Sequence, residues 1–315
     1  MSFSASNGMN HIIQAQQFTP EFIKKIFDLA NHLEMNHETP LKGKIMATLF
    51  YEPSTRTRFS FESAMLRLGG QVITTENARE FSSAAKGETL EDSIRVVSNY
   101  ADVIVMRHFE EGAAERASRV ASVPVINAGD GKGQHPTQAL LDLYTINREL
   151  GGIDGITIAM AGDLKYGRTI RSLSYLLGKY KNVKIIFVSP EALRVGTDIK
   201  EYLKRHNTTY HETEKLEEVL PSLDVLYQTR IQKERFSDPA EYEKLKGCYQ
   251  LTPALADRLP KHAIIMHPLP RVDEISPLVD ASPKALYFKQ TYYGLLVRMA
   301  LLKFVLTPSS FRDEE

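Results

Sequence analysis

The sequence predicts an α/β protein of two domains, each a parallel sheet flanked by helices. Short β-rich runs alternate with helical patterns along the 315 residues, which is typical of parallel sheets. This length suits about two domains, and 43% hydrophobic with 25% charged residues is an ordinary globular composition. The helical stretch that ends at residue 150 is followed by the break GGIDG at 151–155. We therefore predict one domain over residues 1–150 and a second over 151–289.

The predicted strands are the β-rich runs, four on each side of this break. They lie at 44–50, 71–75, 102–106 and 123–128, and then at 155–162, 183–189, 224–229 and 262–266.

The predicted helices are marked by caps and by apolar stripes. Thr19 and Pro20 suit the N-cap and first position of the first helix. Phe61, Met65 and Leu68 form the buried stripe of the next one, which Gly69 can end in a left-handed conformation. Further stripes predict helices after the capping residue Thr89, over 136–150, and near the C-terminus at about 290–315.

The charge and cysteine content exclude several classes of binding partner and site. The chain has 39 basic and 39 acidic residues, so no global field attracts nucleic acid or an anionic membrane. The single cysteine, Cys248, excludes an intrachain disulfide and a multi-thiolate metal site within the chain. No apolar run reaches the length of a membrane span, and the first ten residues lack the features of a secretory signal. We expect a cytoplasmic protein whose partners are small molecules or proteins.

Two arginines stand where the electrostatics of a helix disfavour them. Arg56 and Arg58 lie in the first turn of the helix that is predicted after the first strand. A cation at this positive end of the helix dipole costs about 0.3 to 1 kcal/mol. The hydroxyls of Ser54, Thr55 and Thr57 join backbone N–H groups there, a combination that suits phosphate and would turn the cost into a gain. We predict that Arg56 faces a bound phosphate and that Arg58 is structural, leaning on a glutamate one turn later.

Other polar clusters also follow strands, where open α/β sheets bind ligands. His135 precedes Pro136 at a helix start, which keeps imidazole neutral and able to donate a hydrogen bond. Arg168 begins another helix and suggests a second anion, whereas Arg230 and Gln232 share one side of an extended segment. The segment HPLP at 267–270 predicts a stiff loop with fixed carbonyls, in which an X-Pro bond can be cis. A lone histidine such as His135 also suits a structural role, and the segment that carries Arg230 and Gln232, taken alone, also suits a solvated loop.

Taken together and in this order, the motifs resemble those of the aspartate carbamoyltransferase family, over residues from about 10 to 306. Its sibling, the ornithine family, carries cysteine where this chain reads HPLP and HPTQ, and Lys86 in KGETL also fits the aspartate enzymes. The motifs that carry the resemblance are Ser54–Arg58, Met106–His108, His135–Gln138, Gly162–Arg168, Thr229–Gln232 and His267–Arg271.

The resemblance implies that carbamoyl phosphate binds in the first domain and aspartate in the second. The phosphate is then held by Ser54, Thr55, Arg56 and Thr57, and Arg107 bridges the phosphate and the carbonyl oxygen. Thr57 and His135 donate to that oxygen. The carbamoyl amine is held by Gln138 and the backbone carbonyls of Pro268 and Leu269, and the two carboxylates of aspartate by Arg168, Arg230 and Gln232.

The resemblance also implies an assembly and a mechanism. Ser82 and Lys86 are expected to enter the active site of a neighbouring subunit of a homotrimer, where Lys86 serves both substrates. The last helix returns to the first domain, regulatory chains are possible partners, and no cofactor, metal or covalent enzyme intermediate is needed. The alternatives are a carbamoyltransferase for another amine, such as ornithine, and a binding protein without catalysis.

Overall fold

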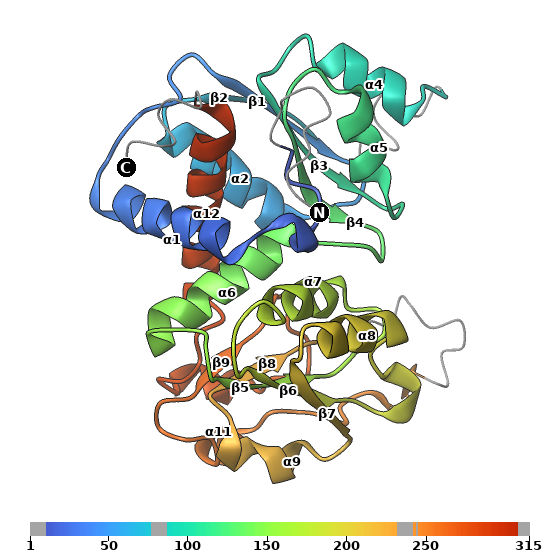
Figure 1. The fold of residues 1–315 in the computed structure, drawn as a ribbon, viewed down its shortest axis with the longest axis vertical. Coiled ribbons are helices and arrows are strands. Elements are labelled where there is room, and N and C mark those ends of the chain that lie inside the picture. Colours follow the sequence, from blue (N-terminus) through green and yellow to red (C-terminus); the bar gives the residue numbers. More distant parts are fainter. Residues whose placement is uncertain (1–10, 77–86, 232–241, 244, 308–315) are drawn as a thin grey trace. The chain divides into compact units, whose positions relative to one another are not determined.

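The structure, a computed structural model, describes residues 11–76, 87–231, 242–243 and 245–307 (Figure 1). The chain forms two compact units, Met1–Leu141 with Tyr292–Glu315, and Asp142–Thr291. Each unit contains one parallel sheet flanked by helices, which confirms the predicted α/β class. The boundary between the units lies between Leu141 and Asp142, whereas the predicted domain boundary lies at residue 150. The predicted domain boundary stays a prediction.

Unit 1 is built on a four-stranded parallel sheet in the order β2-β1-β3-β4. The strands are β1 (Ile45–Phe50), β2 (Gln71–Glu76), β3 (Val103–His108) and β4 (Val125–Asp130). Each of them overlaps one of the predicted runs. The order places β1 and β3 in the middle, so the loops that follow β1, β3 and β4 start from neighbouring strands.

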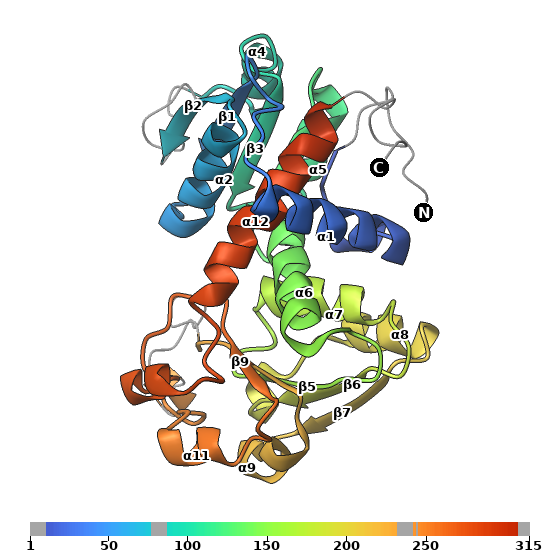
Figure 2. The same cartoon turned by 90° about the vertical axis from the view of Figure 1, so that its left-hand side faces the viewer.

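Helices cover both faces of this sheet (Figure 2). Helices α4 (Leu90–Val97) and α5 (Ala113–Val120) share one hydrophobic cluster with alternate residues of β1 and β3. Helix α2 (Thr55–Arg67) contacts β1 and β2, and its Phe61 ring lies 5.1 Å from the guanidinium of Arg298 in α12 (Lys289–Leu306). The T-shaped pair Phe22 and Phe304 joins α12 to α1 (Pro20–Met35). Part of the last helix thus packs on unit 1.

Unit 2 is built on a five-stranded parallel sheet in the order β7-β6-β5-β8-β9. The strands are β5 (Thr157–Ala161), β6 (Lys184–Val188), β7 (Thr209–Thr213), β8 (Val225–Gln228) and β9 (Ile264–Met266). Strand β7 matches none of the predicted runs. This strand lies at the sheet edge, and none of its side chains is fully buried. It therefore lacks the apolar run that marked its neighbours.

The helices of unit 2 include α7 (Arg168–Leu177), α8 (Thr197–Arg205), α9 (Leu216–Val219) and α11 (Pro253–Asp257). Residues of α9 and α11 belong to a cluster with Ala159, Leu226 and Ile265 of three adjacent strands. Alternate residues of β5 and β8 point to the other face, where Ser174 of α7 contacts Met160. The remaining long helix, α6 (Pro136–Leu150), has the predicted bounds.

The predicted helix signals are present in the structure. Thr19 accepts a hydrogen bond from Phe22 N and precedes Pro20, and Thr89 caps α4 through Asp92 N. Gly69, with φ of 83°, follows α2 in the left-handed region. No helix among the described residues is long and apolar enough to cross a membrane.

Candidate active site

In unit 1 the predicted phosphate ligands lie at the start of α2. Ser54 precedes the helix, and its side chain makes no capping hydrogen bond, so its hydroxyl does not serve the cap that a structural role would require. Thr55 and Arg56 are exposed, whereas Thr57 is buried. The first turn of α2 therefore offers hydroxyl and guanidinium groups together with helix N–H groups, the donor set that suits a phosphate.

Arg58 is structural, as predicted. Its guanidinium is 2.9 Å from the Glu76 carboxylate and 4.0 Å from that of Glu62, and it lies over the ring of Phe59. These contacts link α2 to β2 and compensate the charge that the start of the helix disfavours.

Arg107 comes from the neighbouring strand β3, beside the end of β1. Register pairs it with Phe50, and its carbonyl accepts a hydrogen bond from Tyr51 N, so the loop that leads to α2 starts beside it. Arg107 Nε lies 3.3 Å from the Glu52 carboxylate, a partner that no sequence motif predicts. A bound anion must therefore share this guanidinium with the Glu52 carboxylate or displace it.

His135 and Gln138 stand at the start of α6, after β4. The His135 ring is buried, and its Nδ1 accepts a hydrogen bond of 3.3 Å from Gln138 N. A backbone N–H can only donate, so Nδ1 carries no proton and a neutral ring carries it on Nε2. A neutral His135 ring then has one N–H donor, and its role at the carbonyl oxygen stays a prediction.

In unit 2 the predicted aspartate ligands follow adjacent strands. Arg168 begins α7 after β5, and Arg230 follows β8, which pairs with β5 through Ala161 and Gln228. The two loops touch: Gly162 has φ of 118°, and a Cβ atom there would lie 2.2 Å from the carbonyl oxygen of Thr229. The glycine thus lets the loops that carry the two arginines approach closely.

The HPLP segment follows β9, the next strand of the same sheet. Its Leu269–Pro270 peptide bond is cis, as the sequence allowed, and Leu269 has φ of 54°. Leu269 N donates to His267 Nδ1 at 2.7 Å, and His267 Nε2 lies 2.7 Å from Glu274. The loop is therefore held in one conformation, which agrees with the prediction of fixed carbonyls at Pro268 and Leu269.

Burial keeps His267 neutral. It lowers the pKa of this ring, and the positive charges of Arg271 and Arg230 lower it further, while Glu274 acts in the opposite direction. The pKa of Glu274 is itself lowered, because hydrogen bonds from His267 and from the backbone outweigh its burial. A neutral histidine that donates to a carboxylate matches both observed contacts.

This lowered pKa predicts a loss of stability in mild acid. Below about pH 6.5 an unfolded histidine binds a proton that buried His267 does not. The free energy of unfolding therefore decreases as the pH is lowered, by up to about 1.4 kcal/mol per pH unit for each such ring. His11 and His108, whose pKa values are also lowered by burial, act in the same direction. Urea unfolding between pH 8 and 5.5 measures this slope. The slope should be smaller in His267→Gln than in the original chain, and an unchanged slope would contradict the assignment of His267 as a buried, neutral ring.

Three predicted site residues, Ser82, Lys86 and Gln232, lie outside the described residues. Among the residues that the structure does describe, no group of three or more His, Cys, Asp or Glu side chains is placed to hold a metal ion.

Two family models match the chain almost from end to end. The carbamoyl-P binding domain of aspartate/ornithine carbamoyltransferase matches residues 10–148, and the Asp/Orn binding domain matches residues 154–305. The chain belongs to the aspartate/ornithine carbamoyltransferase family.

Similar proteins place the chain on the aspartate carbamoyltransferase side of this family. It is 58% identical to aspartate carbamoyltransferase 3, chloroplastic, of Pisum sativum, over 95% of this chain and 78% of the relative. It is 57% identical to the aspartate carbamoyltransferase catalytic subunit of Methanocaldococcus jannaschii, over 94% and 97%. A crystal structure of aspartate transcarbamoylase from Trypanosoma cruzi, in complex with carbamoyl phosphate and aspartate, has a TM-score of 0.90 at 44% identity, over 95% of this chain and 97% of that one.

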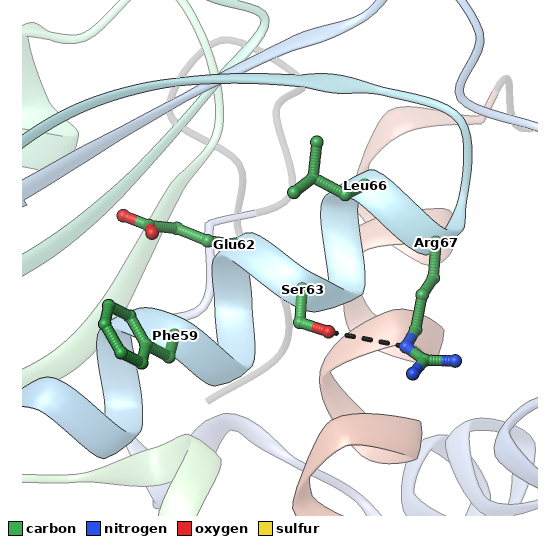
Figure 3. Close-up of a pocket in the computed structure, with 5 residues that line it drawn as sticks. All are labelled: Phe59, Glu62, Ser63, Leu66 and Arg67. Atoms are coloured by element: carbon green, nitrogen blue, oxygen red, sulfur yellow. Dashed lines mark hydrogen bonds between the residues drawn. The ribbon is translucent and has the colours of Figure 1, made fainter.

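A hollow on the outer side of α2 holds none of the residues that the carbamoyltransferase resemblance assigns to substrates. Phe59, Glu62, Ser63, Leu66 and Arg67 line it (Figure 3). Phe59 and Leu66 are 55% and 60% exposed, so the hollow presents two apolar side chains beside the polar Glu62, Ser63 and Arg67. It is distinct from the first turn of α2, where the phosphate ligands are predicted.

Proposed function

We propose that this chain transfers the carbamoyl group of carbamoyl phosphate to the α-amine of L-aspartate, giving N-carbamoyl-L-aspartate and phosphate, an early step of pyrimidine biosynthesis. The observation that carries the proposal is the arrangement of cations and donors in each unit. In unit 1 the proposed phosphate and carbonyl ligands follow β1, β3 and β4. Unit 2 gathers two arginines after β5 and β8. The relative from Trypanosoma cruzi, with both substrates bound, supports the same pair of ligands.

The reaction is a direct transfer. The neutral amine of aspartate attacks the carbamoyl carbon, so a C–N bond forms and negative charge grows on the carbonyl oxygen. The C–O bond to phosphate then breaks, and the departing phosphate takes the proton that the amine loses. The proposed donors to the carbonyl oxygen are Thr57, Arg107 and His135, and such donors stabilise the transition state more than the ground state. No covalent bond to the enzyme is needed.

The proposed ligands divide the other contacts between the substrates. Ser54, Thr55 and Arg56 bind the phosphate at the start of α2, and Gln138 with the carbonyls of Pro268 and Leu269 binds the carbamoyl amine. Arg168, Arg230 and Gln232 bind the carboxylates of aspartate, since the planar guanidinium fork matches a carboxylate in a way that lysine cannot. Ser82 and Lys86 complete the site from a neighbouring chain.

The proposed assembly is a homotrimer. Its support in the structure is an apolar surface on unit 1, where Phe59 and Leu66 of α2 and Ile73 of the edge strand β2 are 42% to 60% exposed. Exposed apolar groups on neighbouring elements favour contact with another chain. Regulatory chains stay a prediction. So does a cytoplasmic location, because the relative from Pisum sativum carries a chloroplastic name.

One assay tests the proposed reaction. The purified chain is supplied with carbamoyl phosphate and either aspartate or ornithine, and the carbamoylated amino acid and phosphate are measured. We expect both products with aspartate and none with ornithine. Product only with ornithine would assign the chain to the sibling activity, and binding of both ligands without product would leave a binding protein.

A further inference from the structure

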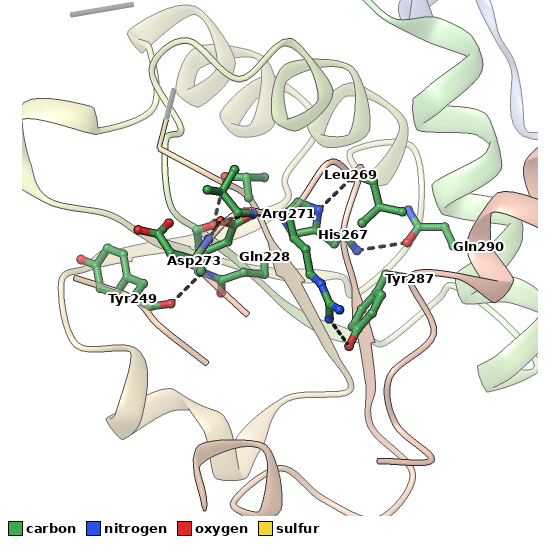
Figure 4. Close-up of polar contacts among 12 residues, drawn as sticks. Gln228, Tyr249, His267, Leu269, Arg271, Asp273, Tyr287 and Gln290 are labelled. Atoms are coloured by element: carbon green, nitrogen blue, oxygen red, sulfur yellow. Dashed lines mark hydrogen bonds and ion pairs between the residues drawn. The ribbon is translucent and has the colours of Figure 1, made fainter. Parts of the chain in front are cut away.

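A chain of buried hydrogen bonds runs from the sheet of unit 2 to the HPLP loop. Tyr227 of β8 donates its hydroxyl to Asp142 Oδ2 of α6 at 2.7 Å, and Gln290 Nε2 of α12 donates to Asp142 Oδ1 at 2.6 Å. Gln290 Oε1 then accepts from His267 N at 3.0 Å (Figure 4). All four residues are at most 2% exposed. We call Tyr227, Asp142, Gln290 and His267 the loop anchor.

Glu274 fixes the rest of the same loop. His267 Nε2 contacts one carboxylate oxygen of Glu274 at 2.7 Å, and the backbone N–H groups of Val272 and Asp273 donate to the other at 3.1 Å each. Through its Nδ1, the His267 ring also accepts from Leu269 N. The loop is thus held at its start, near its middle and at its end, all through buried side chains.

The loop needs this support because its backbone is unusual. Leu269 has φ of 54°, in the left-handed region that leucine rarely adopts. The hydrogen bond from its N–H to His267 secures that conformation, and the orientation of the His267 backbone is in turn set by Gln290. The direction of the adjacent carbonyls of Pro268 and Leu269 therefore depends on the anchor.

The anchor is more polar than packing alone requires. The side chain of Asp142 carries a carboxyl group and has no exposed surface. A buried carboxyl group is tolerated only when hydrogen-bond donors contact its oxygens. Apolar residues of similar volume would fill the same space without that demand. Its hydrogen bonds, however, reach a loop that is assigned to the substrate, and Asp142 follows Gln138 by one turn of α6. A role in positioning explains why a buried polar chain ends at this loop.

We propose that Tyr227, Asp142, Gln290 and His267 are positioning residues that aim the carbonyls of Pro268 and Leu269 at the amine of the carbamoyl group. This inference rests on the proposed function. Through these carbonyls, the anchor affects recognition of the carbamoyl group of carbamoyl phosphate. Recognition of the phosphate group is assigned to the start of α2.

The test compares two ligands that share a phosphate. Gln290→Met keeps the length of the side chain but removes both of its hydrogen bonds, and Tyr227→Phe removes one hydroxyl. Affinities for carbamoyl phosphate and for inorganic phosphate are measured by calorimetry, together with kcat and KM. We expect about tenfold weaker binding of carbamoyl phosphate in Gln290→Met and about threefold in Tyr227→Phe, with phosphate affinity within about twofold of the original.

Tyr202→Phe is the matched control. This substitution in α8 also removes one hydrogen bond, the one that the Tyr202 hydroxyl donates to the Tyr175 carbonyl. Tyr202 is not part of the loop anchor. We expect no change in either affinity. Thermal unfolding checks that each variant is folded at the assay temperature, and Tyr227→Phe decides the matter if Gln290→Met does not fold.

Two results would overturn the proposal. One is an unchanged affinity for carbamoyl phosphate in the folded anchor variants, and the other is an equal loss for both ligands, which a general loss of structure would produce. Failure of the proposed function has a different signature, because the unaltered chain would then form no carbamoyl aspartate.

Discussion

Replacing His135 with alanine is expected to lower kcat by about 10²- to 10³-fold while affinity for inorganic phosphate stays nearly unchanged. The ring stands directly before α6, and its Nδ1 accepts a hydrogen bond from Gln138 N. The remaining nitrogen carries the proton of the neutral ring and can donate to the carbonyl oxygen. Such a donor is most useful as negative charge develops on that oxygen.

His11→Ala is the matched control for this experiment. His11 also accepts a backbone hydrogen bond at Nδ1, from Val125 N at 3.1 Å. That contact lies at the first residue of β4, at the opposite end of the strand from the loop that leads to His135. His11→Ala should cost stability but leave kcat within about twofold. If His135→Ala also kept kcat within about twofold of the original, far short of the loss of a transition-state donor, the assigned role would be wrong.

The fold was predictable wherever a strand carried an apolar run. Eight runs mark eight of the observed strands, and buried β1 and β5 show why: parallel strands covered on both faces need apolar side chains on both. Strand β7 breaks this rule. It forms at an edge through its backbone pairing with β6, and such pairing leaves little trace in composition.

The candidate site was predictable to the extent that its residues stand in local motifs. Arg56 and Arg168 attracted attention because a cation at a helix start is unfavourable without an anion. Glu52 and the hydrogen bonds of the loop anchor were not predicted, for a different reason. Asp142 and Gln290 lie 148 positions apart and meet only after folding, so no local pattern of charge or spacing indicates their hydrogen bond. Contacts that position a site are mostly of this long-range kind.

Mixing two inactive variants is expected to restore activity if active sites are shared between chains. Arg56→Ala removes a phosphate ligand at the start of α2, and Lys86→Ala removes the group assigned to the neighbouring site. In trimers re-formed from an equal mixture, a site is intact when its own chain retains Arg56 and its neighbour retains Lys86. Each condition holds for half of the chains, so we expect about a quarter of the original specific activity, against a background of about a hundredth or less.

The control mixture joins Arg56→Ala with His135→Ala. Both residues belong to unit 1 of one chain, Arg56 in α2 and His135 before α6. Every site in such a mixture lacks one of them, so random exchange cannot rebuild a complete set and activity should stay at background. Recovery in the first mixture alone therefore requires that Arg56 and Lys86 of one site come from different chains. Background activity in both mixtures, with exchange verified by mass spectrometry of the re-formed oligomers, would show instead that each chain builds its own site, and the trimer would then need another explanation.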